Sequence, residues 1–206
     1  MSALQPEHGH EDTSLNEERL RAGVYSLLAG LLRSPPDEEM LKRLEGIESQ
    51  TDKSLDGIAT AWVMLKAAAM SGDLSAMNDE YHALFIGLGR GELVPYGSWY
   101  ITGFLMEKPL SALRQDLTLL GYERQTDVHE PEDHAAAICE IMAMLILDTD
   151  ISFDRQRQFF ATHIGPWIEI FFQDLEKAQA AQFYRAVGRL GFEFIKLEKR
   201  YFSMLV

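Results

Sequence analysis

Apolar residues in this chain recur three and four positions apart, and this spacing constrains the fold more than any other feature. It is clearest in two stripes, Leu20, Val24, Leu27, Leu28 and Leu31, then Phe183, Val187, Leu190, Phe194 and Leu197. The spacing is that of one face of an α-helix. The sequence has no series of alternating Val, Ile and Thr with hairpin turns, which disfavours βαβ folds and β-sandwiches. We therefore predict an all-α protein, a single compact helical bundle of about nine or ten helices.

Capping and helix-breaking residues set the expected boundaries. A Ser-x-x-Glu capping box starts the first helix at Ser14, and Pro131 is expected to open the apolar helix that ends at Leu147. The other expected helices cover residues 36–47, 55–70, 74–86, 109–120, 153–163, 166–177 and 178–206. Residues 1–13 are polar and are expected to form a disordered leader. That leaves residues 14–206 as a single all-helical domain.

The charge balance narrows the class of partner. Lys and Arg number 19 against 32 Asp and Glu, giving a net charge of -13, and the basic residues form no stripe. Nucleic acid is therefore not an expected partner. An acidic surface of this kind would instead attract cationic partners, including peptides that carry Arg or Lys.

The expected compartment is the cytoplasm. The amino end has neither the positive nor the apolar segment of a secretory signal, and the single cysteine, Cys139, has no partner for an internal disulfide. The longest apolar run, Ala135 to Leu147, is interrupted by Glu140 and is shorter than the roughly 18 residues of a membrane span. We expect no stable membrane insertion.

Three patterns could carry chemistry, and each is incomplete. The glycines Gly87, Gly89 and Gly91 follow a helical segment and lack the Gly-Lys-Ser/Thr ending of a phosphate loop, so a chain reversal explains them better than a nucleotide. Cys139 lies among Ala, Ile and Met, where an inert thiol is expected. No Gly-x-Ser-x-Gly nucleophile elbow is present.

The third pattern is a cluster of acids and histidines, and it supports the alternative function, an all-α metal-dependent phosphohydrolase. The candidate ligands are His129, Glu130, Asp133 and His134, with His82 or His163. However, no His-x-x-x-His pair is present, and the order Asp-His is the reverse of the dipeptide in that enzyme class. We therefore expect no metal, no cofactor and no enzymatic activity.

The richest candidate is an interaction surface around "NDEYHALFIGLGRGELVPYGSWY". Tyr81, Leu84 and Phe85 share one helix face, and the loop that follows adds Pro95, Tyr96, Trp99 and Tyr100. Two interpretations are open. These side chains either fill the core beneath a long loop or line a groove for an apolar peptide, with the acids of "HEPEDH" at its border.

Two of these motifs together resemble the TorD/DmsD family of cytoplasmic chaperones for molybdenum-containing redox enzymes. They are "EYHALFIGLG....VPYGSWY" and, some thirty residues later, "EPEDH" at the start of an apolar helix. The stretch "FFATHIGPWIEIFFQDLEKAQAAQFYRAVGRL" is also similar to the family's carboxyl-terminal region. The loop departs from the family pattern, with one proline where two are usual and Gly97 where Glu is common.

The resemblance implies a non-enzymatic role. Such a chaperone binds the twin-arginine leader, and often the apoprotein, of a molybdoenzyme catalytic subunit precursor until the molybdenum cofactor is inserted, and export follows. Some family members serve enzymes that are not exported, so the type of client stays open. Monomer and helix-exchanged dimer are both open, as is a scaffold role in which the carboxyl-terminal helices bind a folded partner.

The site hypothesis assigns a role to each motif. Glu130 and Asp133 contact the arginines of the leader, and His134 orients a carboxylate or the loop. The apolar wall consists of Tyr81, Leu84, Phe85, Pro95, Tyr96, Trp99 and Tyr100. For Asp133 there is also a structural interpretation, because an acid in the first turn of a helix interacts with the exposed N–H groups and the helix dipole.

Overall fold

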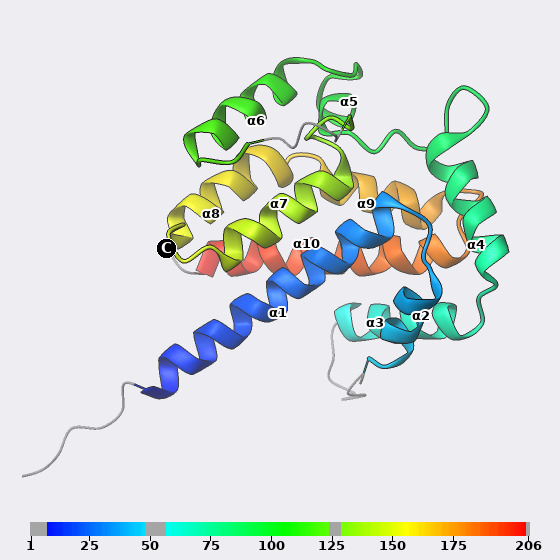
Figure 1. Ribbon diagram of the computed structural model, residues 1–206, viewed down its shortest axis with the longest axis horizontal. Helices are drawn as coiled ribbons and strands as arrows, with labels where there is room; N and C mark the ends of the chain where they lie inside the picture. Colours follow the sequence, from blue (N-terminus) through cyan, green and yellow to red (C-terminus); the bar gives the residue numbers. More distant parts are fainter. Residues whose placement is uncertain (1–7, 48–56, 124–128, 205–206) are drawn as a thin grey trace, which may run out of the picture.

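The computed structural model describes residues 8–47, 57–123 and 129–204, and this part of the chain is helical without a β-strand (Figure 1). The all-α prediction is confirmed. The α-helices are α1 (His8–Arg33), α2 (Glu38–Glu45), α3 (Gly57–Met70), α4 (Leu74–Tyr81), α5 (Gly97–Thr102), α6 (Lys108–Leu119), α7 (Ala135–Leu147), α8 (Phe153–Phe159), α9 (Ile168–Lys177) and α10 (Phe183–Met204). Two π-helical segments, η1 (His82–Ile86) and η2 (Phe160–Ile164), extend α4 and α8.

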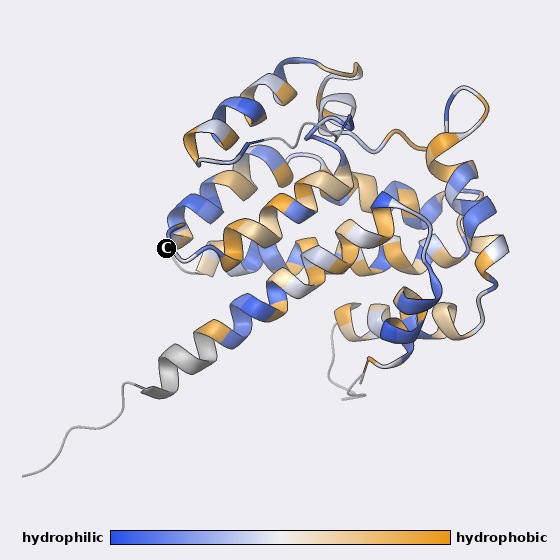
Figure 2. Cartoon of the chain, viewed as in Figure 1, coloured by the Kyte–Doolittle hydropathy of each residue, from blue (hydrophilic) through white to orange (hydrophobic). Residues whose placement is uncertain are grey.

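The core forms where α1, α7 and α10 pack together, with α9 and α3 against α10 (Figure 1). Most of α7 is hydrophobic in Figure 2, as expected of a helix buried on more than one side. One ion pair crosses this core: the guanidinium of Arg21 donates two hydrogen bonds of 2.7 and 2.8 Å to the carboxylate of Glu198. This pair joins α1 to α10, and neither residue faces the groove described below.

Several helix boundaries differ from the sequence-based expectation. The first helix begins at His8 instead of Ser14, so residues 8–13 of the expected leader are helical, while residues 1–7 lie outside the described residues. The capping box at Ser14 favours a start but does not prevent an earlier one, and no proline interrupts residues 8–33. The expected helix over residues 74–86 is α4 followed by the π-helical η1.

The apolar helix α7 begins at Ala135, four residues after the expected opening at Pro131. His134 has extended backbone dihedrals, and its Nδ1 accepts a hydrogen bond of 3.1 Å from the backbone N–H of Ala136. His134 is therefore the N-cap, and Pro131 belongs to the preceding turn.

The last helix, α10, begins at Phe183 instead of Ala178 because a carboxylate from α4 caps it. The side chain of Glu80 accepts hydrogen bonds of 2.7, 3.0 and 2.7 Å from the backbone N–H groups of Gln182, Phe183 and Tyr184. An acid at this position satisfies N–H groups that have no partner within the helix. The contact fixes α4, and therefore η1, relative to α10.

None of the helices in the described part of the chain combines the length and the apolar character needed to cross a bilayer.

Candidate functional site

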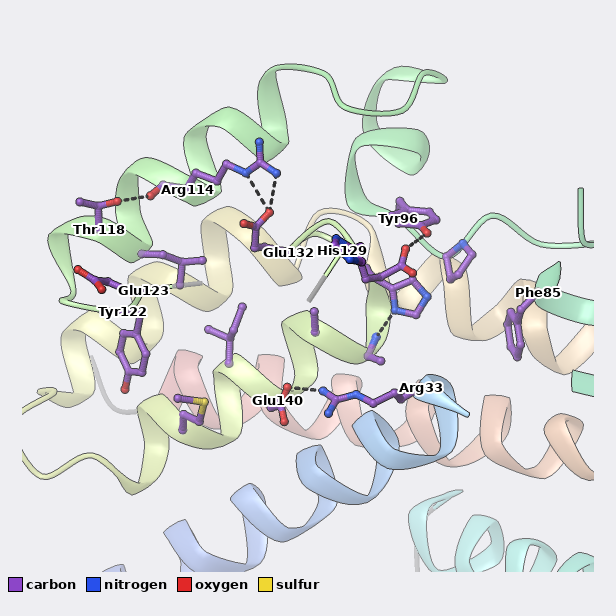
Figure 3. A pocket seen from close by; sticks show the side chains of 18 of the residues that line it. Arg33, Phe85, Tyr96, Arg114, Thr118, Tyr122, Glu123, His129, Glu132 and Glu140 are labelled. Atoms are coloured by element: carbon purple, nitrogen blue, oxygen red, sulfur yellow. Dashed lines mark hydrogen bonds and ion pairs between the residues drawn. The ribbon is translucent and has the colours of Figure 1, made fainter. Parts of the chain in front are cut away.

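A groove of about 1140 Å³ opens between α6, α7 and the segment from η1 to α5 (Figure 3). Its lining includes six of the ten predicted site residues: Tyr81, Phe85, Pro95, Tyr96, Glu130 and His134. The two sequence motifs, some fifty residues apart at their first residues, therefore meet at one surface.

The other four predicted residues, Leu84, Trp99, Tyr100 and Asp133, do not line the groove. Leu84 is fully buried in the core, so its place on one helix face with Tyr81 and Phe85 reflects packing. Tyr100 packs against Trp167, with ring centroids 5.7 Å apart, and donates a hydrogen bond of 3.1 Å to Asp174. The interpretation as core-filling residues thus holds for Leu84 and Tyr100.

Trp99 lines a second, smaller cavity of about 280 Å³ that shares Phe85, Pro95 and Tyr96 with the groove. The guanidinium of Arg90, in the Gly-rich loop, lies over the Trp99 ring at 4.7 Å from its centroid. This cation–π contact connects the loop to α5. Trp99 therefore belongs to an extension of the aromatic surface beyond the groove.

Asp133 has a structural role that the sequence did not predict. Its side chain is 4% exposed, and its Oδ2 accepts a hydrogen bond of 2.8 Å from the backbone N–H of Ser98, in the first turn of α5. Its backbone carbonyl accepts a further bond of 2.9 Å from Gly97. Asp133 precedes α7 and stabilises the start of α5, so the expected position in the first turn of its own helix is wrong.

The loop before α5 is held against the start of α7 by backbone pairing. Tyr96 and His134 form an isolated antiparallel bridge, and the N–H of Ala135 donates to the carbonyl of Pro95 over 2.8 Å. These bonds fix the positions of the Tyr96 and His134 side chains, whose rings meet edge to face with centroids 5.0 Å apart.

Gly97 explains how this loop departs from the family pattern. A Cβ atom at this position would lie 3.0 Å from Nε1 of Trp167, a side chain that is 1% exposed. A glutamate at the same position would require Trp167 to move. In this chain, the position of the buried Trp167 indole therefore requires a small residue at position 97.

His134 is buried, and burial lowers its pKa from the ordinary value of 6.5, although Glu130 and Asp133 act in the opposite direction. The bond from Ala136 also requires an unprotonated Nδ1. His134 therefore stays neutral near pH 7 and contacts the loop before α5 through its ring and its backbone.

Four glutamates line the groove: Glu123, Glu130, Glu132 and Glu140. Glu130 accepts a hydrogen bond from the hydroxyl of Tyr96, and burial together with this carboxylate raises the pKa of Tyr96. Among the described residues, two arginines line the same groove, Arg33 and Arg114, and each is paired with one of these glutamates. In this described part of the lining, acidic groups outnumber basic ones, as a site for a cationic ligand requires.

Apolar side chains also line the groove. Leu117 comes from α6, Ile141 and Met144 from α7, and Phe85 and Ile86 from η1. Figure 3 shows Phe85 at one end of the groove and Tyr122 at the other, with Glu132 and His129 between them. Met144 is 46% and Ile86 53% exposed, so this apolar surface is accessible.

The alternative chemistries have little support in this geometry. Among the described residues, no three His, Cys, Asp or Glu side chains are positioned to hold a metal ion together. His163 pairs with Asp116 over 2.6 Å, and His82 bonds the carbonyl of Asn78. Cys139 is fully buried, and burial raises the pKa of its thiol.

Comparisons with known proteins agree with the motifs. The family model of the nitrate reductase delta subunit matches residues 51–173. The chaperone protein TorD of Vibrio cholerae serotype O1 is 25% identical over 213 residues, which is 93% of this chain and 95% of that protein. The Tat proofreading chaperone DmsD of Haemophilus influenzae is 30% identical over 119 residues, 55% of this chain and 56% of its own length.

The fold is also similar to a solved structure. The crystal structure of a redox enzyme maturation protein from Archaeoglobus fulgidus superimposes with a TM-score of 0.55 at 17% identity, covering 95% of this chain and 98% of that one. At that identity the match supports the fold alone. Together with the family model and the curated chaperones, the motifs lead to one conclusion: the chain belongs to the TorD/DmsD family of redox-enzyme maturation chaperones and is not an enzyme.

Proposed function

We propose that the groove binds the twin-arginine leader of a molybdoenzyme precursor in the cytoplasm and retains it until the molybdenum cofactor is inserted, before export. The observation that carries this proposal is a groove whose lining combines four glutamates with accessible apolar side chains. A twin-arginine leader has the matching composition, since a cationic segment is followed by a short apolar one. The similarity to a Tat proofreading chaperone supports the same proposal.

Glu130 is the main proposed contact for a peptide guanidinium. Its carboxylate is exposed and accepts a hydrogen bond from the hydroxyl of Tyr96. Guanidinium groups bind carboxylates through two parallel hydrogen bonds and stack on aromatic faces, so one arginine can use both groups. The apolar segment of the leader would lie on the surface beside Phe85 and Ile86 or beside Ile141 and Met144.

Asp133 has an indirect role in this proposal. With its side chain buried against Ser98, it holds α5 and the loop that carries Tyr96, so that the groove has its shape before a peptide arrives. Direct contact with arginine belongs instead to Glu130 and Glu132, from the same acidic motif.

The test is capture of a synthetic twin-arginine leader peptide by the purified full-length chain, measured by calorimetry or fluorescence anisotropy across a salt series. Glu130→Gln removes one charge in the groove and should weaken binding by about 3- to 10-fold, with the loss shrinking at high salt. Glu39→Gln is the matched control because Glu39 pairs with Arg43 on the surface of α2 and does not line the groove.

A second peptide, with both arginines replaced by glutamine, separates charge from apolar contact. We expect it to bind more weakly than the parent peptide and to be insensitive to Glu130→Gln. If the parent chain captures neither peptide, or captures both equally, the groove is not a twin-arginine site.

A further inference from the structure

One of the acids in the groove already has a guanidinium bound to it. Nε and Nη2 of Arg114, on α6, both lie 2.9 Å from Oε2 of Glu132, in the turn before α7 (Figure 3). The Glu132 side chain is 14% exposed, whereas that of Arg114 is 49% exposed. The carboxylate is thus partly removed from water, and the arginine that neutralises it approaches from the solvent side.

This contact has the same chemistry that a leader arginine would use. We propose that Arg114 is an internal competitor: it occupies Glu132 in the empty groove, and an incoming cationic peptide must displace it. The inference rests on the proposed function of the groove and names a residue that sets its affinity and selectivity. A ligand that forms a good guanidinium–carboxylate pair can replace Arg114, and a ligand without such a group cannot.

The exposure of the two partners favours exchange. Since Glu132 is partly desolvated, losing the Arg114 contact without a replacement is costly, so one cation should replace another. Arg114 is half exposed, and an ion pair with one such partner contributes little net stability. The free-energy cost of moving Arg114 away from Glu132 should therefore be small. The Arg114–Glu132 pair should therefore lower the affinity for weakly binding ligands and add little to the free energy of unfolding.

A second ion pair in the groove, Arg33 with Glu140, allows the effects of removing the two arginines on peptide affinity to be compared. There the side chains are 55% and 49% exposed, so both groups are well hydrated without each other. Removing Arg33 should therefore change peptide affinity less than removing Arg114 does. Each variant removes one positive charge from the same groove. The expected difference between the two changes in affinity therefore comes from the burial of the glutamate partner.

Arg114→Gln tests the proposal in the full-length chain with the twin-arginine peptide. We expect binding about 2- to 5-fold tighter than that of the parent chain, the range of a partly exposed ion pair. Arg43→Gln is the matched control, since it removes the same charge from an exposed pair on α2 that does not line the groove. It should leave the affinity within error of the parent value.

Two further arms separate competition from a general charge effect. The gain should vanish in the double variant Arg114→Gln with Glu132→Gln, and it should be absent for the peptide whose arginines are glutamines. Arg114→Lys keeps the charge but loses the two-nitrogen contact, so it should show a smaller gain. It also tests the proposal if the glutamine variant folds poorly.

The binding results distinguish failure of the competitor role from failure of the proposed function. If the parent chain captures the peptide and Arg114→Gln binds equally or more weakly, the competitor role is overturned and the proposed function stands. An equal gain in Arg43→Gln would also overturn it. If neither the parent chain nor the variant captures the peptide, both proposals fail.

Discussion

The two long sides of the groove are built by different interactions. On one side, the loop before α5 is joined to the start of α7 by backbone hydrogen bonds and by the buried Asp133 carboxylate. On the other, α6 packs its buried leucines inward and reaches its neighbours through two side-chain pairs, Arg114 with Glu132 and Asp116 with His163. We therefore expect the first side (the fixed side) to be the more rigid of the two and the second (the adjustable side) to be the more adjustable.

The largest effect should follow removal of the carboxylate that holds the fixed side. Asp133→Ala leaves the buried N–H of Ser98 without its acceptor, and we expect the free energy of unfolding to fall by about 2–3 kcal/mol. Asp133→Asn keeps an acceptor oxygen and should cost less. Urea unfolding of both variants checks this order, and parent-like stability of the alanine variant would show that the fixed side does not depend on this carboxylate.

Gly97→Ala should be the next largest change. The added Cβ meets the buried Trp167 ring, and overpacking of this kind costs about 1–2 kcal/mol. Gly23→Ala is the matched control, because Gly23 is exposed within α1 and a Cβ there meets nothing within 4 Å. Alanine should stabilise that helix by about 0.5–1 kcal/mol. Thermal melts that move both variants in the same direction would contradict the account of Gly97.

The fixed side should also depend on pH through His134. Burial lowers the pKa of His134 from 6.5, so the unfolded chain takes up a proton there before the folded chain does. Its contribution to stability is therefore full above about pH 6.5 and decreases as the pH falls below that value, by up to about 1 kcal/mol per pH unit. His134→Asn keeps a capping side chain without a titrating ring. Unfolding measured at several pH values should give a flatter profile for this variant than for the parent; identical profiles would exclude His134 as the source.

The smallest change in stability is expected on the adjustable side. Asp116→Asn weakens the pair with His163, and because Asp116 is 46% exposed the cost should be about 0.5 kcal/mol. Hydrogen exchange is the sharper measurement. Amides of α6 should exchange faster in this variant while those of Gly97, Ser98 and Ala135 stay protected. Equal acceleration on both sides would mean that the groove opens as one unit.

The sequence predicts the helical content well and the helix ends less well, for a physical reason. Apolar stripes report which face of a helix is buried, and they locate α1 and α10, although Leu20 and Leu197 at the ends of the two stripes are exposed. This signal is weak in α5, which has only six residues and was not predicted as a helix. The hydrogen bond between Asp133 and the start of α5 could therefore not be predicted from the sequence. The sequence-based hypothesis placed Asp133 in contact with the ligand or in the first turn of its own helix.

Residues within a local motif are the ones that the sequence places correctly in the groove lining. Tyr96, Glu130 and His134 lie in motifs and reach the groove. Arg33 and Glu140 were missed because they are separated by 107 residues and meet only once α1 and α7 have packed. Spacing within one helix contains no information on such a pair. Arg114 is hidden in the same way, since its partner is in another segment.

The capping of α10 by Glu80 bears on when during synthesis the groove becomes complete. Tyr81 and Phe85 follow directly after Glu80, and their rings contact Tyr184 at centroid distances of 5.9 and 5.5 Å. That tyrosine is about a hundred residues further along the chain. A ribosome-bound chain from which Tyr184 has not yet emerged therefore lacks the support for one end of its own binding surface. The client binding that we propose would therefore become possible only after the segment carrying Tyr184 has left the ribosome.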